Sequence, residues 1–204
     1  PGDNGDSIKV NIHQRTEELY RIQNQIPDND GLITAPVIFL DDPIVFPRMI
    51  SPIYINEEES LKAIFSAQSD NRTVIALLES FDENEDQNGQ SYLPIGVELA
   101  VGRLIELQDG EYTALVQSRR RVELKELVAA DKITYVKAIE VIDQYRPSKR
   151  VEALMRSVRD LFKSCVEMDE SLPEESYMYS LNISDPGWLS DMISTILSLP
   201  KEQR

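Results

Sequence analysis

The hydrophobic pattern of the chain changes character near residue 145, and this change constrains the fold more than any other feature. From about residue 35 to 143, short runs rich in β-branched and aromatic residues, such as "APVIFL", "TVIALLES" and "ITYVKAIEVI", are separated by turn residues. After "DQYRPSKR", apolar residues recur at intervals of three and four from Val151 to Cys165, which is typical of helices. The sequence therefore predicts an α+β fold in which a β-rich part precedes a helical part.

Local signals refine this prediction. Asp109-Gly110, between "LIELQ" and "EYTALV", predicts a type I′ hairpin, because that turn needs positive φ at both central residues. Residues 56–69 predict a helix that begins with acidic residues, which the helix dipole favours. In the helical part we expect three helices, the last of them with Asp185 as its N-cap and Pro186 as its first residue.

Composition limits the classes of function. The chain has 204 residues and a formal net charge of -15, which argues against a nucleic-acid binder, because such proteins use Lys and Arg to neutralise phosphates. Polypeptides, cations or basic partners suit this charge better. No apolar run approaches the roughly 20 residues that span a bilayer, so we expect a soluble intracellular protein with no membrane partner. The chain begins with Pro1 and ends at Arg204, and we interpret it as a fragment of a longer protein.

The sequence contains no recognisable catalytic centre. It lacks the phosphate-binding G-x-x-x-x-G-K-[ST] motif and the G-x-S-x-G nucleophile elbow. With one histidine, His13, and one cysteine, Cys165, it has neither an internal disulfide nor a usual zinc set, and Cys165 is expected to pack in a helical core. The acidic loop 82–93 resembles a calcium loop at three positions, but Gln87 and Leu93 stand where glycine and glutamate are required. We expect no catalytic residue, cofactor or metal in this fragment.

Two features leave alternatives open. The basic run Arg119–Arg121 is expected to form ion pairs with the chain's own carboxylates, and the alternative is contact with an acidic partner. Residues 8–26 carry apolar residues at helical spacing. A helix there would either cover its own domain or dock on a partner.

Residues 35–64, "APVIFLDDPIVFPRMISPIYINEEESLKAI", resemble the start of the N-terminal domain of Lon ATP-dependent proteases. In that family a P-V-x-x-L-[RD]-[DN] strand leads to V-x-F-P-x-M, an x-P-[LI] strand and a charged helix. Two later blocks also resemble the family, "IGVELAVGRLIELQDGEYTALVQSRRRVEL" and "SDPGWLSDMISTILSLP". The chain departs from the family pattern at Val97, Leu99 and Ser118, which replace Thr, Ala and Gly, and at the acidic "NEEES".

The resemblance implies a PUA-like β-barrel at residues 35–145, a helical bundle at residues 146–204 and an N-terminal extension at residues 1–34. It further implies a full-length ATP-dependent serine endopeptidase of the Ser-Lys type, with ATP and Mg bound by an ATPase module outside this fragment. That protein would be a hexamer in the bacterial cytoplasm or, alternatively, in an organelle matrix. The isolated fragment is expected to be a monomer or a weak dimer.

The resemblance also implies a non-catalytic role in capturing unfolded or damaged polypeptides and in assembly. The candidate contacts lie in the proline-rich turn, the strand after it and the following helix start: Phe46, Arg48, Met49, Tyr54, Glu57, Glu58 and Glu59. The alternatives are that Phe46 and Met49 pack in the core or the turn, and that the glutamates form a solvated first helical turn. A stand-alone Lon-domain adaptor or ligand-binding module, with no protease attached, is the alternative function.

Overall fold

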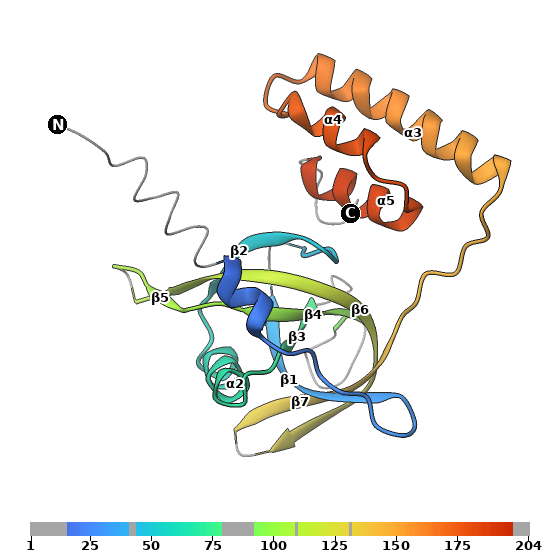
Figure 1. Ribbon diagram of the computed structural model, residues 1–204. Coiled ribbons are helices and arrows are strands. Elements are labelled where there is room, and N and C mark those ends of the chain that lie inside the picture. The colour runs from blue at the N-terminus through green and yellow to red at the C-terminus, as the bar shows by residue number, and fades with distance from the viewer. Residues whose placement is uncertain (1–15, 41–43, 79–91, 109, 131, 198–204) are drawn as a thin grey trace, which may run out of the picture. The chain divides into compact units, whose positions relative to one another are not determined.

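The computed structural model describes residues 16–40, 44–78, 92–108, 110–130 and 132–197 (Figure 1). The chain divides into two compact units, residues 1–141 and 142–204. Among the residues discussed above, 8–15 with His13, 82–91 and Asp109 lie outside the described residues.

The first unit contains the predicted strands and one helix. In chain order its elements are β1 (Leu32–Leu40), β2 (Ile50–Ile55), α2 (Glu58–Ser69), β3 (Val74–Leu78), β4 (Ile95–Val101), β5 (Ile105–Glu106), β6 (Tyr112–Ala130) and β7 (Ile133–Glu140). In the sequence, residues 111–127 contain two β-rich runs, "EYTALVQS" and "RVELKEL", whereas the structure has one strand of 19 residues, β6. The arginines at 119–121 lie within this strand with half-buried side chains, and Arg119 and Arg120 reach partners in the same unit.

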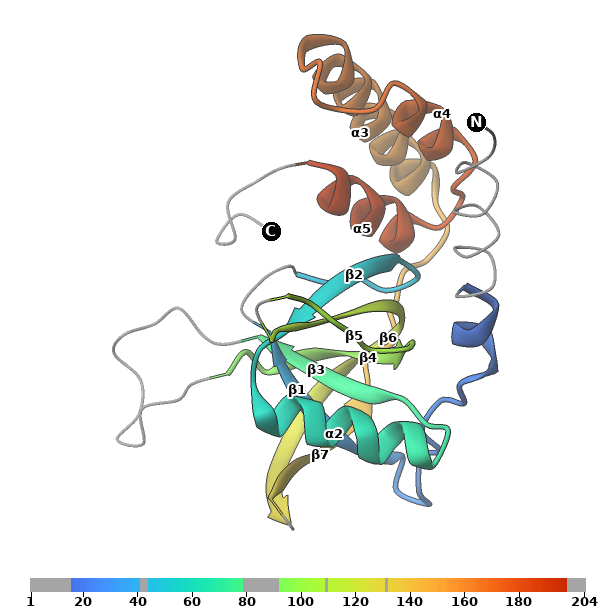
Figure 2. The same cartoon turned by 90° about the vertical axis from the view of Figure 1, so that its left-hand side faces the viewer.

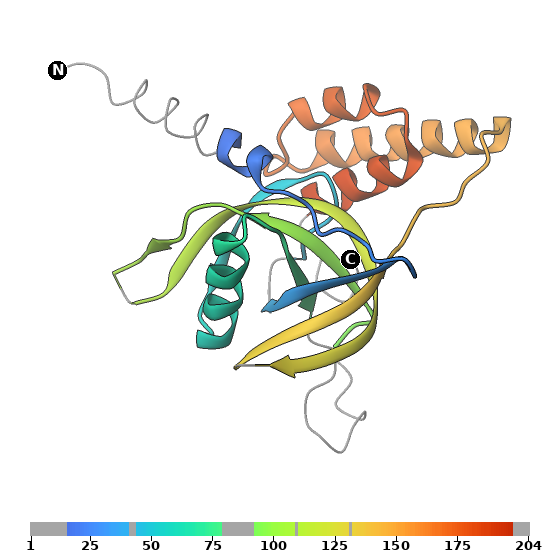
Figure 3. The same ribbon diagram turned by 60° about the horizontal axis from the view of Figure 1, so that its bottom comes forward.

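The strand pairings of the first unit close on themselves. From β6 the pairings run to β4, β3, β1 and β7, and β7 pairs with β6 again (Figure 3). Only the β1–β3 pair is parallel among these contacts. The described pairings of β2 are with β6 alone, and β5 also pairs with β6. The long strand β6 therefore pairs with four other strands: β2, β4, β5 and β7.

Apolar residues on both faces of the sheet are buried. On β1, Ile33, Ala35 and Val37 pack in one cluster, with Val122 and Val136 from β6 and β7. Ile38 and Leu40 of β1 join a second cluster that includes the buried face of α2, which lies against the sheet (Figure 2). A strand buried on both faces reads as a continuous apolar run rather than an alternating one. This explains why "APVIFL" in β1 is an unbroken run of apolar residues.

The predicted hairpin between β5 and β6 is confirmed, with a different turn. The Leu107 N–H donates to the Glu111 carbonyl at 2.7 Å, and the Gly110 N–H donates to the Leu107 carbonyl at 3.1 Å. Gly110 therefore ends the turn and is not one of its two central residues, as a type I′ turn would require. Its φ of 85° fits the three-residue loop that closes with a left-handed residue.

The N-terminal segment is helical in its described part only up to residue 21, whereas its apolar spacing continued to residue 26. Residues 16–21 are helical, and Leu19 is fully buried in the first unit. The Arg119 guanidinium donates to the carbonyls of Leu19 at 2.8 Å and Ile22 at 3.4 Å. These bonds satisfy carbonyls at the end of the helix, which stops at residue 21. Ile26 is accordingly non-helical and 71% exposed.

The second unit contains three helices: α3 (Lys149–Met168), α4 (Glu175–Leu181) and α5 (Pro186–Ile196). The predicted N-cap is confirmed, since the Asp185 carboxylate accepts from the Trp188 N–H at 2.7 Å and Pro186 opens α5. The core of the unit consists of Met155, Phe162, Ile183, Leu189, Met192 and Ile193, with Trp188 packed against it.

Cys165 does not join this core, contrary to the prediction. It is half-buried and belongs to the neighbouring apolar stripe of α3, whereas Phe162 and Met155 turn inward. Among the described residues, no helix combines the length and the apolar character needed to cross a bilayer.

Candidate functional site

The proline-rich turn before β2 is held by Ser118 of β6. The Ser118 hydroxyl accepts from the Met49 N–H at 2.9 Å and is also within hydrogen-bond distance of the Phe46 and Met49 carbonyls. The Arg48 N–H donates to the Ser118 carbonyl at 3.1 Å, and Arg48 itself has a positive φ of 64°. Since Ser118 stands where the resembled family has glycine, its hydroxyl adds bonds to the turn that a glycine could not make.

The candidate contact residues in this turn differ in how far they are exposed. Val45 and Pro47 are buried, Phe46 and Met49 are half-buried, and Arg48 is exposed. Phe46 and Met49 therefore pack partly within the turn and keep part of their surface accessible.

Strand β2 continues the turn as an exposed apolar row, defined here as Ile50, Pro52 and Tyr54. Ile50 is 39% exposed and Tyr54 is 57% exposed, while the alternate residues Ile53 and Ile55 are buried. Alternation follows from strand geometry, in which successive side chains point to opposite faces. Tyr54 was a sequence candidate, but Ile50 and Pro52 were missed, although the period-two pattern of "ISPIYI" contained the signal.

Pro52 occupies a strand position that tolerates a missing N–H. It lies opposite Leu115 in the antiparallel pairing of β2 with β6, and β2 ends the order of the described sheet. Proline in a sheet is confined to edge strands, strand ends or bulges. The apolar row thus lies on a strand with one described neighbour.

Each of the three glutamates at the start of α2 has a partner within the first unit. Glu58 forms an ion pair with Lys62 at 2.6 Å, and the hydrogen bond and charge of Lys62 lower the pKa of Glu58 below its usual value. The Glu59 carboxylate accepts from the Thr134 hydroxyl at the start of β7, and the Glu57 carboxylate accepts from the Ser60 hydroxyl at 3.3 Å.

Glu58 and Glu59 line a hollow of about 450 Å³, together with Lys62, Ala129, Lys132, Ile133 and Thr134. The turn and the apolar row contribute no residue to this hollow among those described. The structure therefore separates the sequence candidates into two places: the turn with β2, and the start of α2 with the end of the β6–β7 hairpin.

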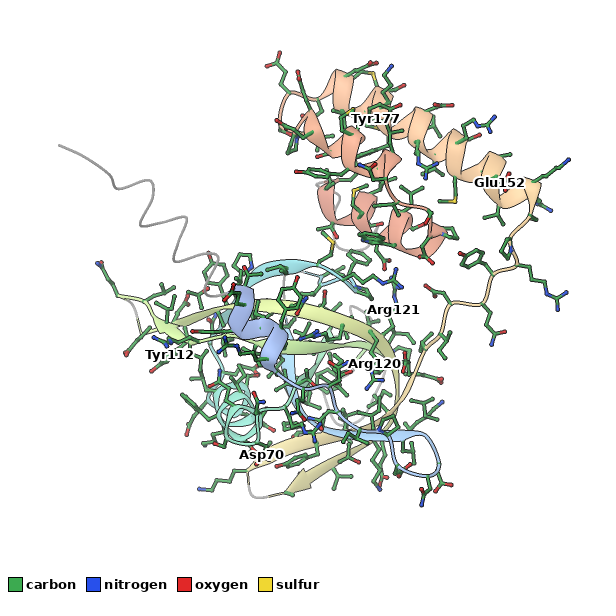
Figure 4. The ribbon with its side chains drawn as sticks, in the orientation of Figure 1. Asp70, Tyr112, Arg120, Arg121, Glu152 and Tyr177 are labelled. Carbon is green, nitrogen blue, oxygen red and sulfur yellow. The ribbon has the colours of Figure 1, made fainter. Side chains whose placement is uncertain are left out.

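A third feature is a cluster of charged side chains around Arg120 of β6, which pairs with Glu98 of β4 and Glu140 of β7 (Figure 4). The Glu98 side chain is fully buried, and its two oxygens accept from Arg120 and from the Thr73 hydroxyl and Gln25 N–H. Arg120 also pairs with Glu140 at 2.7 Å. Burial alone would lower the pKa of Arg120, but the charge and hydrogen bond of Glu98 and the contact with Glu140 raise it above its ordinary value.

The ion pairing predicted for the basic run is thus confirmed at Arg120, while Arg119 binds backbone carbonyls instead. In the part of the chain that the structure describes, no group of three or more His, Cys, Asp or Glu side chains could hold a metal ion.

Comparison with known proteins places the chain in a family. Residues 34–204 match the family model described as the ATP-dependent protease La (LON) substrate-binding domain. Lon protease 2 of Herpetosiphon aurantiacus is 30% identical over 169 residues, which cover 82% of this chain and 20% of that protein. Lon protease 1 of Myxococcus xanthus is 32% identical over 172 residues, which cover 82% of this chain and 21% of that protein.

The fold is also similar to that of a solved structure, the N-terminal domain of a Mycobacterium avium complex Lon protease. The TM-score is 0.67 at 22% sequence identity, covering 83% of this chain and 86% of that one. The chain spans about a fifth of the length of the curated relatives it matches. These matches, together with the sheet-rich unit and the helices that follow it, show that the chain belongs to the family of Lon protease substrate-binding domains.

Proposed function

We propose that the chain binds unfolded or damaged polypeptide segments through the turn at residues 46–49 and the apolar row on β2. The observation that carries this proposal is the row itself, an exposed line of Ile50, Pro52 and Tyr54 on a strand that pairs with β6 alone among the described strands. Contiguous exposed apolar surface marks interaction sites. An open strand edge adds main-chain hydrogen bonds that accept any sequence.

Charge adds a preference to this surface. The net charge of -15 favours segments that carry basic residues, because complementary charge speeds encounter. Of the charged candidates, Arg48 and Glu57 are exposed in the turn and just after β2. Glu58 and Glu59, which line the separate hollow, are proposed to contribute to the acidic surface rather than to contact the segment on β2.

The test is binding of fluorescein-labelled β-casein, an unfolded probe, measured by fluorescence anisotropy. The variant carrying Ile50→Ser and Tyr54→Ser is expected to bind at least tenfold more weakly, because each truncation removes roughly 1–2 kcal/mol of apolar contact. Phe65→Ser on α2 is the matched control, since Phe65 is 53% exposed and lies off the row. Equal weakening by the control, with both variants folded by circular dichroism, would rule out the row as the contact surface.

We propose further that the full-length protein is a cytoplasmic, hexameric ATP-dependent serine endopeptidase of the Ser-Lys type. In that protein ATP and Mg belong to an ATPase module outside these residues. The proposal is supported by relatives about five times longer than the matched region. We also propose that the closed strand circuit is a PUA-like barrel and that α3, α4 and α5 form the helical bundle.

The coding sequence tests the protease assignment. It is expected to continue past codon 204 into a G-x-x-x-x-G-K-[ST] phosphate-binding motif and then a serine and lysine pair. A stop codon shortly after residue 204 would contradict the assignment and favour the stand-alone adaptor.

A further inference from the structure

Helix α3 carries two apolar stripes, and the buried core of its own unit is built on one of them. The inner stripe includes Met155 and Phe162, which are buried against α4 and α5. A helix at the surface of a globular unit needs one such stripe. The second stripe remains exposed, with Leu154 at 56%, Leu161 at 68% and Met168 at 78%.

The exposed stripe has the spacing of a coiled coil. We define the outer stripe as Val151, Leu154, Val158, Leu161, Cys165 and Met168. Its first member, Val151, is half-buried and also packs against the core of the unit. The members of the stripe follow one another at alternating intervals of three and four residues along the whole helix, which is the a/d pattern of a helix seam. Such regular spacing over 20 residues fits a second helix, because an unfolded segment imposes no period.

The charges of α3 differ between its two ends. Lys149, Arg150 and Arg156 outnumber Glu152 in the N-terminal part of α3. At and just beyond the C-terminal end lie the exposed Glu167, Asp169 and Glu170, of which Glu167 pairs with Lys163 at 3.5 Å. Two copies of α3 side by side in opposite directions would bring each positive end against a negative end. Antiparallel helices also place opposite dipole ends together. A parallel pair would instead bring like charges together.

We propose that the outer stripe of α3 docks on the outer stripe of a second copy of this chain, with the two helices antiparallel. A two-fold axis between Val158 and Leu161 pairs every member of the stripe: Val151 with Met168 of the second copy, Leu154 with Cys165, and Val158 with Leu161. Such an interface is self-complementary, as two-fold symmetry requires.

A single helix pair makes a small interface, so the dimer is expected to be weak. A 20-residue helix is about 30 Å long, and contacts of this extent fall toward the low end of specific interfaces. The inference does not depend on polypeptide binding by β2, since the outer stripe lies wholly on α3.

Cysteine cross-linking tests both the contact and its direction. Leu154→Cys places a thiol opposite Cys165 of the second copy, so mild oxidation is expected to give a covalent dimer on a non-reducing gel. Within one chain the two thiols lie 11 positions apart on a helix, about 16 Å along its axis, too far for a disulfide. Arg156→Cys, exposed on the other side of α3, is the matched control and should remain monomeric.

Three cross-linking results would contradict the proposal. No covalent dimer from Leu154→Cys, or equal dimer from Arg156→Cys, overturns the proposal. Rapid dimer formation by the wild-type chain through Cys165 alone indicates a parallel pair and overturns the antiparallel arrangement.

Sedimentation equilibrium of the 204-residue chain provides a second measurement. Leu161→Glu is expected to raise the dimer dissociation constant at least tenfold, whereas Met178→Glu, at a residue 60% exposed on α4, should leave it unchanged. A wild-type chain that stays monomeric at all concentrations contradicts the proposal. If Leu161→Glu instead weakens β-casein binding and leaves sedimentation unaltered, the stripe binds polypeptide and the dimer is excluded. Ile50→Ser with Tyr54→Ser should not affect the dimer, which keeps this test independent of the one on β2.

Discussion

Replacing Arg120 with alanine is expected to lower the free energy of unfolding of the first unit by about 3–5 kcal/mol. The loss arises because the substitution removes the guanidinium that pairs with the fully buried Glu98 side chain, which leaves a buried polar group without that partner. The Gln25 carbonyl and Glu140 would lose their contacts with Arg120 as well. Urea unfolding followed by far-ultraviolet circular dichroism measures the change.

Two controls identify the cause of this loss. Lys137→Ala removes an exposed ion pair with Glu126, in which both side chains are about half accessible, and should cost less than about 1 kcal/mol. The double variant with Glu98→Leu and Arg120→Met should recover most of the loss, because an apolar pair leaves no buried charge. If Arg120→Ala costs no more than Lys137→Ala, burial of Glu98 does not depend on this partner.

Phe162→Ala is expected to unfold the second unit while the sheet of the first unit persists. Phe162 is 2% exposed at the centre of a core of six buried residues, and truncation of a buried phenylalanine costs about 3–5 kcal/mol. Units of this size have little stability to lose. Trp188, the single tryptophan, packs on this core, so its fluorescence reports unfolding of the second unit specifically.

The neighbouring residue supplies the matched control. Leu161 is 68% exposed on the same turn of α3, and Leu161→Ala should change the free energy of unfolding by less than about 0.5 kcal/mol. If the two substitutions shift the unfolding transition of Trp188 fluorescence equally, the claim that Phe162 is buried and Leu161 exposed on α3 is contradicted.

The order of strands and helices could be predicted from the sequence because burial sets local periodicity. The N-cap at Asp185 could also be predicted, because its side chain bonds to a backbone N–H only three residues later. The continuity of β6 could not be predicted in this way. The arginines in its centre look like a break in an apolar run, and their partners, including Glu98 and the Leu19 carbonyl, come from segments distant in sequence.

The candidate site was predicted in part. Prolines and the family resemblance identified the turn and Tyr54, but neither predicts that the Ser118 hydroxyl fastens the turn from 69 residues away. Likewise the contact of Glu59 with Thr134 depends on where the β6–β7 hairpin ends. The apolar row could have been predicted from the sequence, because Ile50, Pro52 and Tyr54 are spaced two residues apart and side chains at that spacing share one face of a strand.

The closed circuit of strands also has a consequence for the order of folding. The first described strand, β1, completes its pairing with β7, the last strand of the unit, as in the pair Leu32 and Ile139. Contacts between residues so far apart in sequence slow folding, because the intervening chain must lose its freedom before the pairing stabilises it. The helices of the second unit make local contacts and form quickly. When the denatured chain refolds, the meeting of its β1 and β7 segments therefore sets the pace.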